Sequence, residues 1–280
     1  MIKIVTDSTC DLPSGWLARL NITVVPVNIQ FGAETFREGF DISPAAFYQR
    51  INSTGALPTT SQPSVGEYCQ IYEQLAADGS DILSVHLTSQ LSGTWQTATL
   101  AARQLSGTAR ITVIDSHTGS VGLGLMVREA AQLVAAGLTV EQIAPRLEAR
   151  RSQIFVAILL KDLRYARMSG RVGRVRETFA SLLNVQPIIG VDSGALIPLD
   201  RVRGQHRGFE RMVSLAEAAV GRRPVHLAVA HAVCQPQAEA LLELVAARLN
   251  CRDTFIADLA TSLAVHFGPG AVGFAAYPAE

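Results

Sequence analysis

Short apolar runs alternate with longer amphipathic segments through the first half of the chain. The runs are rich in Val and Ile and are bounded by Asp, Gly or Pro, which is typical of strands. They cover residues 2–5, 22–29, 81–87 and 110–115. The segments between them predict helices that begin at Ser43-Pro44 and at Ser64, that span 95–105 and 120–136, and that run from Thr139 to about 151. Glu67 follows Ser64 at the spacing of a capping box. Strands alternating with helices predict an α/β domain with a mostly parallel sheet.

The pattern changes near residue 153. A strand is predicted over 153–160, and an Arg-rich polar stretch follows it. Further on we expect two strands joined by the Asp-Ser-Gly turn at 192–194, a helix over 204–220, a buried strand over 223–232, a helix over 236–248 and a short helix before the glycine-rich end. We therefore expect two intimately packed α/β domains. Residues 1–152 would form one with a parallel sheet and anion-binding loops, and residues 153–280 one with a mixed sheet.

Hydroxyl side chains are concentrated in two short stretches, PTTSQPS at 58–64 and TSQLSGT at 88–94. The prolines hold the first stretch extended. The second lies where a strand leads into a helix, and a helix N-terminus favours an anion through its free N–H groups and its dipole. Gly93 would let a ligand approach that backbone closely. We expect Thr60, Ser61, Ser92 and Gly93 to face one another and to hold a carboxylate or a phosphate.

Polar loops follow three of the predicted strands: TDSTCD after 2–5, TSQLSGT after 82–87 and DSHTGSVG after 111–114. The carboxyl ends of parallel strands meet at one edge of a sheet, where ligands bind. The three loops are therefore expected to lie together.

Composition excludes several classes of function. Formal net charge is zero, which argues against a nucleic-acid partner because phosphate neutralisation needs a basic surplus. The four cysteines are scattered, so we expect neither a metal site nor a disulfide framework. No apolar stretch is long enough to predict a transmembrane segment, and the first residues do not resemble a signal peptide. The expectation is a cytoplasmic protein without a cofactor.

His266 ends a predicted helix just before a glycine-rich loop. It is expected either to be a cation at the helix C-terminus or to donate a hydrogen bond to a ligand carboxylate. Ser92, His266 and Asp7 or Asp115 could also form a hydrolase triad, although the chain has no G-x-S-x-G elbow. An esterase or thioesterase using Ser92 therefore remains an alternative, as does a sensor of another small anion.

Arginines cluster twice and predict local positive fields in a neutral chain. The first cluster is Arg164, Arg167, Arg171, Arg174 and Arg176, and the second is Arg201, Arg203, Arg207 and Arg211 with His206. Either an acidic partner surface or a phosphate would fit these fields.

Six short motifs occur in an order that resembles the DegV family: TDSTCDL, PTTSQPS, T-x-x-L-S-G-T, VIDS at 113–116, M-S-G-R at 168–171 and V-H-F-G-P-G near the end. The resemblance covers the whole chain. It implies a carrier, not a catalyst, that holds one long-chain fatty acid such as palmitate, stearate or oleate in a tunnel between two α/β domains. A separate fatty acid kinase would phosphorylate the bound carboxylate for phospholipid synthesis.

The resemblance also implies roles for individual residues. Thr60 or Ser61, Ser92 and Gly93 would contact the carboxylate, with Arg171 and His266 close by. The segment with Arg201, Arg203, His206 and Arg207 would dock the kinase, although its sequence VRGQHRG is less basic than the family pattern. Burial of the tail would contribute about 0.8 kcal/mol per methylene.

Overall fold

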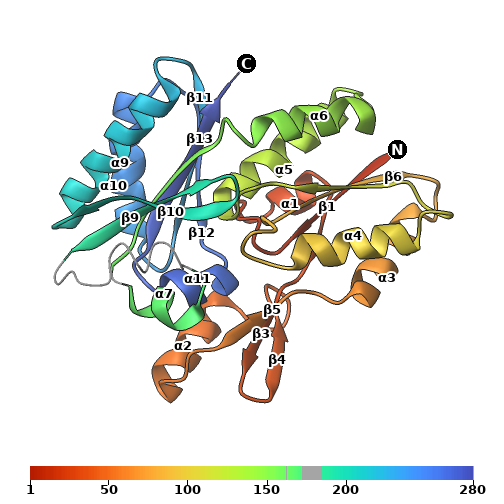
Figure 1. Ribbon diagram of the computed structural model, residues 1–280, viewed down its shortest axis with the longest axis horizontal. Coiled ribbons are helices and arrows are strands. Elements are labelled where there is room, and N and C mark those ends of the chain that lie inside the picture. The colour runs from red at the N-terminus through yellow and green to blue at the C-terminus, as the bar shows by residue number, and fades with distance from the viewer. Residues whose placement is uncertain (162, 172–184, 280) are drawn as a thin grey trace.

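Two β-sheets stand side by side in the computed structural model, and a smaller third sheet lies beneath them in the view of Figure 1. The structure describes residues 1–161, 163–171 and 185–279. Both ends of the chain lie at the top of this view, away from the small sheet.

The first sheet is parallel throughout, as the alternation of strands and helices predicts. Its order is β2 (Ile22–Val25), β1 (Ile2–Asp7), β6 (Asp81–His86) and β7 (Ile111–Asp115). The central strands are apolar on both faces, and Val5, Ile82 and Leu83 are fully buried. A parallel sheet covered by helices on both sides requires this pattern.

Helices cover both faces of the parallel sheet. They are α3 (Val65–Ala76) and α4 (Thr94–Gln104) on one face, α5 (Ser120–Ala135) and α6 (Val140–Arg150) on the other, and the short α1 (Trp16–Arg19). The capping box predicted at Ser64 is confirmed: the Ser64 hydroxyl accepts from Glu67 N, and the Glu67 carboxylate accepts from Ser64 N. Helix α6 begins with a second capping box, between Thr139 and Gln142.

The second sheet is six-stranded and mixed. Its order is β10 (Ala195–Val202), β9 (Gln186–Asp192), β8 (Phe155–Leu159), β13 (Val272–Pro278), β11 (Val225–His231) and β12 (Cys251–Asp258). The predicted turn at 192–194 is confirmed, with positive φ at Ser193 and Gly194, as a two-residue hairpin loop demands. The sequence did not predict β12 and β13.

Helix α5 packs between the two sheets and contributes to the cores of both. Leu123 and Met126 face the parallel sheet, whereas Val121 and Leu125 join a core with side chains of the mixed sheet such as Phe255. The other face of the mixed sheet is covered by α9 (Gln205–Val220) and α10 (Gln235–Arg248) (Figure 1). Two short helices, α7 (Arg164–Ser169) and α11 (Thr261–Phe267), lie together at one end of the mixed sheet.

The small sheet corrects one prediction. Residues 22–29 were expected to form a single strand, but this is wrong: the run divides at Pro26 into β2 and β3, which belong to different sheets. Proline cannot donate to a ladder, so it ends one strand and starts a new direction. The small sheet contains β4 (Glu34–Arg37), β3 (Asn28–Phe31) and β5 (Thr59–Ser61), and α2 (Pro44–Thr54) packs against it. The first half of the PTTSQPS stretch contains the edge strand β5, Thr59–Ser61, and its last residue, Ser64, caps α3.

Candidate functional site

The three polar loops meet at one edge of the parallel sheet, as predicted. Asp7 Oδ2 accepts from Leu87 N at 2.9 Å, which joins the loops after β1 and β6. Thr88 N donates to Thr118 O at 2.9 Å, which joins the loops after β6 and β7. The edge is therefore a single hydrogen-bonded platform.

A polar pocket lies on this platform, and we call it the hydroxyl pocket. The site residues predicted from the sequence all line it: Thr60, Ser61, Ser92, Gly93, Arg171 and His266. They come from β5, from the start of α4, from the end of α7 and from α11. Sequence reasoning missed other polar residues in its wall, among them Thr9, Gln62, Ser89, Gln90 and Ser262. Polar loop residues are common, so no signal separated these from ordinary turn residues.

The β5 segment and the start of α4 are in direct contact, although more than thirty residues separate them. Gln62 Nε2 donates to Thr97 Oγ1 at 3.3 Å. The Gln62 side chain also lies so close to Gly93 that a Cβ at position 93 would come within 2.6 Å of Gln62 Cδ. Gly93 is the N-cap residue of α4 and has no side chain to satisfy the first N–H groups of the helix. The hydroxyl of Ser92 lies 2.8 Å from that of Thr94.

His266 is largely buried in the wall of the pocket. Burial lowers the pKa of its imidazole to about 4, and the positive charge of Arg171 acts in the same direction. The ring is therefore neutral near pH 7, and the expectation of a cation at the helix C-terminus is wrong. Nδ1 of His266 is buried without a hydrogen-bond partner within the described part of the chain. The role as a donor to a ligand stays a prediction.

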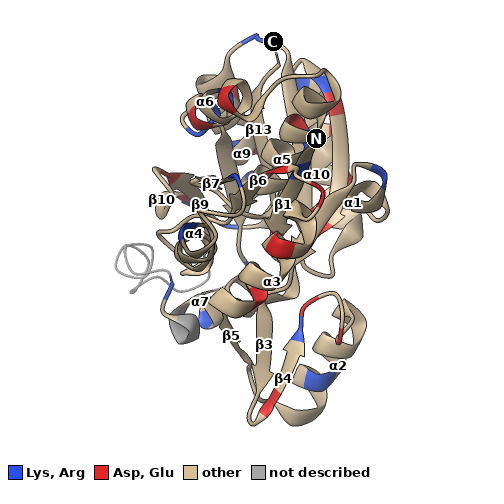
Figure 2. Ribbon diagram, turned by 90° about the vertical axis from the view of Figure 1, so that its right-hand side faces the viewer, with Lys and Arg blue, Asp and Glu red and all other residues tan. Residues whose placement is uncertain are grey.

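The arginine clusters differ in what can be described. Arg171 is exposed at the pocket, whereas Arg174 and Arg176 lie outside the described residues. The second cluster begins within β10 and continues to the start of α9, and its members Arg201, Arg203, His206 and Arg207 are all exposed. Basic and acidic residues are otherwise interspersed over the helices seen in Figure 2.

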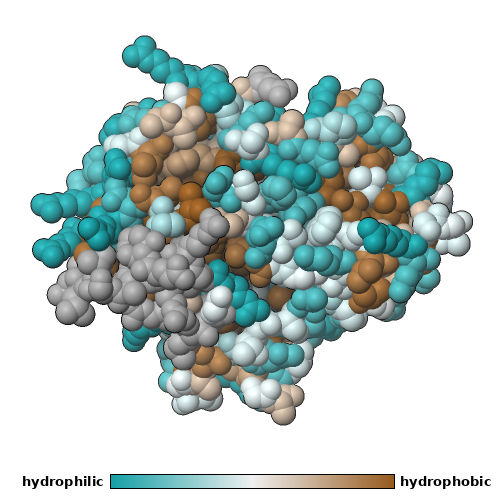
Figure 3. All heavy atoms as spheres, viewed as in Figure 1, coloured by the Kyte–Doolittle hydropathy of each residue, from teal (hydrophilic) through white to brown (hydrophobic). Residues whose placement is uncertain are grey.

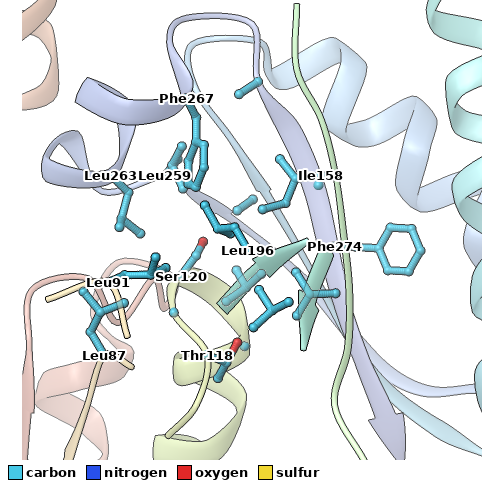
Figure 4. Close-up of a pocket in the computed structure, with 18 of the residues that line it drawn as sticks. Leu87, Leu91, Thr118, Ser120, Ile158, Leu196, Leu259, Leu263, Phe267 and Phe274 are labelled. Atoms are coloured by element: carbon cyan, nitrogen blue, oxygen red, sulfur yellow. The ribbon is translucent and has the colours of Figure 1, made fainter. Parts of the chain in front are cut away.

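An apolar hollow adjoins the hydroxyl pocket and lies between α5 and the mixed sheet. Figure 4 shows side chains that line this hollow. It has about 610 Å³ of empty space, part of which is open to solvent. Five side chains line both spaces: Leu87, Leu91, Leu196, Leu263 and Phe267. Brown, apolar atoms also reach the surface in the middle of the face in Figure 3, between the two sheets. The two spaces together have one polar and one apolar end.

Two buried carboxylates, which the sequence did not single out, hold α11 in place beside the pocket. Glu38 accepts from the Thr261 hydroxyl at 2.8 Å and from both the N–H and the hydroxyl of Ser262 at 2.7 Å. Asp11 accepts from Ala260 N at 3.0 Å and also from Ser120. Burial raises the pKa of both carboxyl groups, against the effect of these hydrogen bonds.

The residues suggested for a hydrolase triad are not joined to one another in the described part of the chain. Asp7 is bound to His86 at 3.0 Å deep inside the sheet, and Asp115 accepts from backbone N–H groups of its own platform. Although burial alone would raise the pKa of Asp7, the hydrogen bond and charge of His86 hold it below its usual value. Among the described residues, the His266 nitrogen that would need a carboxylate has no partner. The described residues therefore do not form a catalytic triad with Ser92.

Three features bear on other classes of ligand. None of the described helices is both long enough and apolar enough to cross a membrane. Within the same described ranges, no group of three or more His, Cys, Asp or Glu side chains could hold a metal ion. The four cysteines are free, and Cys10 and Cys234 are buried.

Three comparisons with known proteins find relatives of the same family. The sequence model of a family described as uncharacterised proteins, DegV family, matches residues 1–279. A DegV domain-containing protein of Deinococcus radiodurans is 36% identical over 281 residues, covering 99% of this chain and 98% of that protein. A structure reported for the fatty acid binding of a DegV family protein from Thermus thermophilus superposes with a TM-score of 0.93 at 32% identity, covering 99% of each chain. DegV of Bacillus subtilis, described as a fatty acid binding protein, superposes with a TM-score of 0.89 at 27% identity, also covering 99% of each chain.

Proposed function

The chain belongs to the DegV family, and we propose that it is a carrier that binds one long-chain fatty acid. The carboxylate occupies the hydroxyl pocket, and the acyl tail fills the apolar hollow. The observation that carries the proposal is that a polar and an apolar space lie side by side and share five apolar side chains in their walls. A molecule with one anionic end and one long apolar end fits that arrangement, and the relatives from Thermus thermophilus and Bacillus subtilis are described as binding fatty acids.

The hydroxyl pocket offers a carboxylate what it needs inside a protein. A buried carboxylate costs several kcal/mol unless its oxygens are hydrogen-bonded. Hydroxyls of Thr60 or Ser61 and of Ser92 donate to it, and the first N–H groups of α4 add the positive end of the helix dipole. Neutral His266 adds one N–H donor, and Arg171 adds charge at the entrance.

We further propose that the bound acid is presented to a fatty acid kinase in the cytoplasm, which makes an acyl phosphate for phospholipid synthesis. The exposed segment with Arg201, Arg203, His206 and Arg207 docks that kinase. Strand β10 supports this link because it carries Leu196 in the site and Arg201 further along the same strand. Two domains, 1–152 and 153–280, would then hold the acid between them.

A binding titration tests the central part of this proposal. Delipidated protein is titrated with palmitate, stearate and oleate, and a stoichiometry of one per chain is expected. Ser92→Ala and Thr60→Val should each weaken binding by about tenfold, the loss of one hydrogen bond to a charged group. Ser106→Ala, an exposed serine beyond the end of α4, is the matched control and should bind as the parent does. Unchanged affinity in both pocket variants would show that the carboxylate does not bind in the hydroxyl pocket.

A further inference from the structure

The apolar hollow has a second polar neighbour at a different place from the hydroxyl pocket. We call it the distal pocket, and it is lined by His117, Thr118, Arg151, Ser152, Ile154, Val156, Val191, Asp192 and Ser193. Thr118, Val156 and Val191 line both the hollow and the distal pocket. No described residue lines both the distal and the hydroxyl pocket. The hollow therefore lies between two polar spaces, and an acyl tail that starts in one is directed toward the other.

Thr118 stands where the hollow meets the distal pocket, and the residue is 3% exposed. Its backbone groups are satisfied: Thr118 N donates to Ser116 Oγ, and Thr118 O accepts from Thr88 N. Its hydroxyl oxygen, in contrast, is buried without a partner among the described residues. An unpaired hydroxyl in a buried wall is uncommon, because the group loses its water and gains nothing in return.

This hydroxyl lies in the wall of the hollow, beside the first turn of α5. Thr118 Oγ1 lies directly against Gly122, where a Cβ would collide with it, and Gly122 also lines the hollow. Figure 4 draws Thr118 with the side chains around this space. The neighbouring wall is apolar, with Val121, Val156 and Ile158. The hollow is also lined by Thr88 and Ser120, but their hydroxyls donate to Gly194 O and to Asp11. Among the described residues that line the hollow, Thr118 is therefore the one whose hydroxyl has no partner, in surroundings otherwise suited to methylenes.

We propose that Thr118 selects long-chain fatty acids that carry a hydroxyl group in the distal half of the acyl chain. This inference rests on the proposed fatty-acid binding and names a substrate class within it. The ligand hydroxyl forms a hydrogen bond with Thr118 Oγ1. This bond offsets the cost of desolvating the hydroxyl, which an entirely apolar wall would leave uncompensated. An unsubstituted tail still binds and leaves Thr118 unpaired.

The test compares octadecanoic acid with octadecanoic acids hydroxylated at successive positions of the distal half, in the parent and in Thr118→Val. Valine keeps the shape of threonine and removes the hydroxyl. In the parent, at least one hydroxylated isomer should bind as tightly as the plain acid or more tightly. In Thr118→Val that isomer should lose about tenfold in affinity, while the plain acid binds as before or better. Thr112→Val, the same change on β7 at a residue that lines none of the three pockets described here, should leave the ratio of affinities unchanged.

Two results would overturn the proposal. One is that every hydroxylated isomer binds the parent at least tenfold more weakly than octadecanoic acid. The other is that Thr118→Val leaves the ratio between the isomers and the plain acid unchanged, as expected if water alone satisfies Thr118. Binding of plain octadecanoic acid to Thr118→Val shows that the variant is folded. Failure of plain octadecanoic acid to bind the parent is a separate outcome, and it contradicts the proposed function itself.

Discussion

At the scale of single residues, the structure explains why position 93 is glycine. The backbone there has an ordinary negative φ of −77°, so the conformation does not require glycine. The requirement is space, because the Gln62 side chain occupies the place of a Cβ. The sequence predicted close approach at Gly93, but it expected the approach to come from a ligand. In the structure the neighbouring loop itself approaches.

Gly93→Ala tests this contact. The added methyl group must push the end of the Gln62 side chain toward the pocket, so we expect fatty-acid affinity to fall by roughly tenfold. Stability should change by less than about 1 kcal/mol, because the atoms that must move belong to a flexible side chain. Gly107→Ala is the control, since a Cβ there meets no atom within 4 Å. Equal affinities for the two alanine variants would contradict this account of Gly93.

His266 gives the ligand-free protein a specific dependence on pH. The imidazole has a pKa of 6.5 when unperturbed and about 4 in the folded chain. Between these values only the unfolded chain binds the proton, so stability is complete above about pH 6.5 and falls as the pH drops toward 4. The full loss corresponds to about 3 kcal/mol. We expect His266→Gln to lose this part of the acid sensitivity, measured as the free energy of unfolding in urea between pH 4 and pH 7.5. Parallel pH profiles for the parent and the variant would count against the burial of a neutral ring.

At the scale of elements, the sequence predicted features that depend on residues close together in the chain, but not those that depend on contacts between distant residues. Ser64 and Glu67 are three residues apart, so the start of α3 was predictable. Strand β5 has its partner in β3, thirty residues earlier, and the sequence indicated only that β5 would be extended. Glu38 receives its hydrogen bonds from Thr261 and Ser262, more than two hundred residues away. No local pattern marks such a residue.

Glu38→Ala tests whether this carboxylate holds α11. The change leaves donors of Thr261 and Ser262 buried without an acceptor, and we expect the free energy of unfolding to fall by about 3 kcal/mol. Fatty-acid affinity should fall as well, because α11 carries Leu263 and His266. Urea titration measures the first effect, and Glu73→Ala, an exposed acid on α3, should shift it by no more than about 0.5 kcal/mol. A loss below 1 kcal/mol for Glu38→Ala would mean that Glu38 does not hold α11, which would then depend on Asp11 and on apolar contacts.

At the scale of the whole molecule, three features could be predicted from the sequence. They are the parallel sheet, the loop platform, and the gathering of the six predicted residues at one pocket. The alternation of strands and helices fixes which loops share an edge. The hollow was not predictable residue by residue, because Leu196, Leu263 and Phe267 are ordinary core residues in the sequence. Only the packing of the mixed sheet against α5 leaves a space beside them.

The proposed docking of a kinase also belongs to this scale. Arg203→Glu combined with Arg207→Glu reverses two exposed charges beyond the fatty-acid site. We expect acyl phosphate formation by a purified fatty acid kinase to fall at least tenfold, while the titrated affinity for the fatty acid stays unchanged. Arg222→Glu, an exposed change beyond the other end of α9, should leave the kinase rate unaltered. Full activity of the double variant would exclude this segment as the docking site.

The most direct measurement is a crystal structure of the protein saturated with palmitate. The account predicts one acid per chain, with its carboxylate within hydrogen-bonding distance of Ser92 and of Thr60 or Ser61, and with its tail running past Leu263 and Phe267 into the hollow. A hollow that stays empty at saturation, or a carboxylate bound elsewhere, would contradict it.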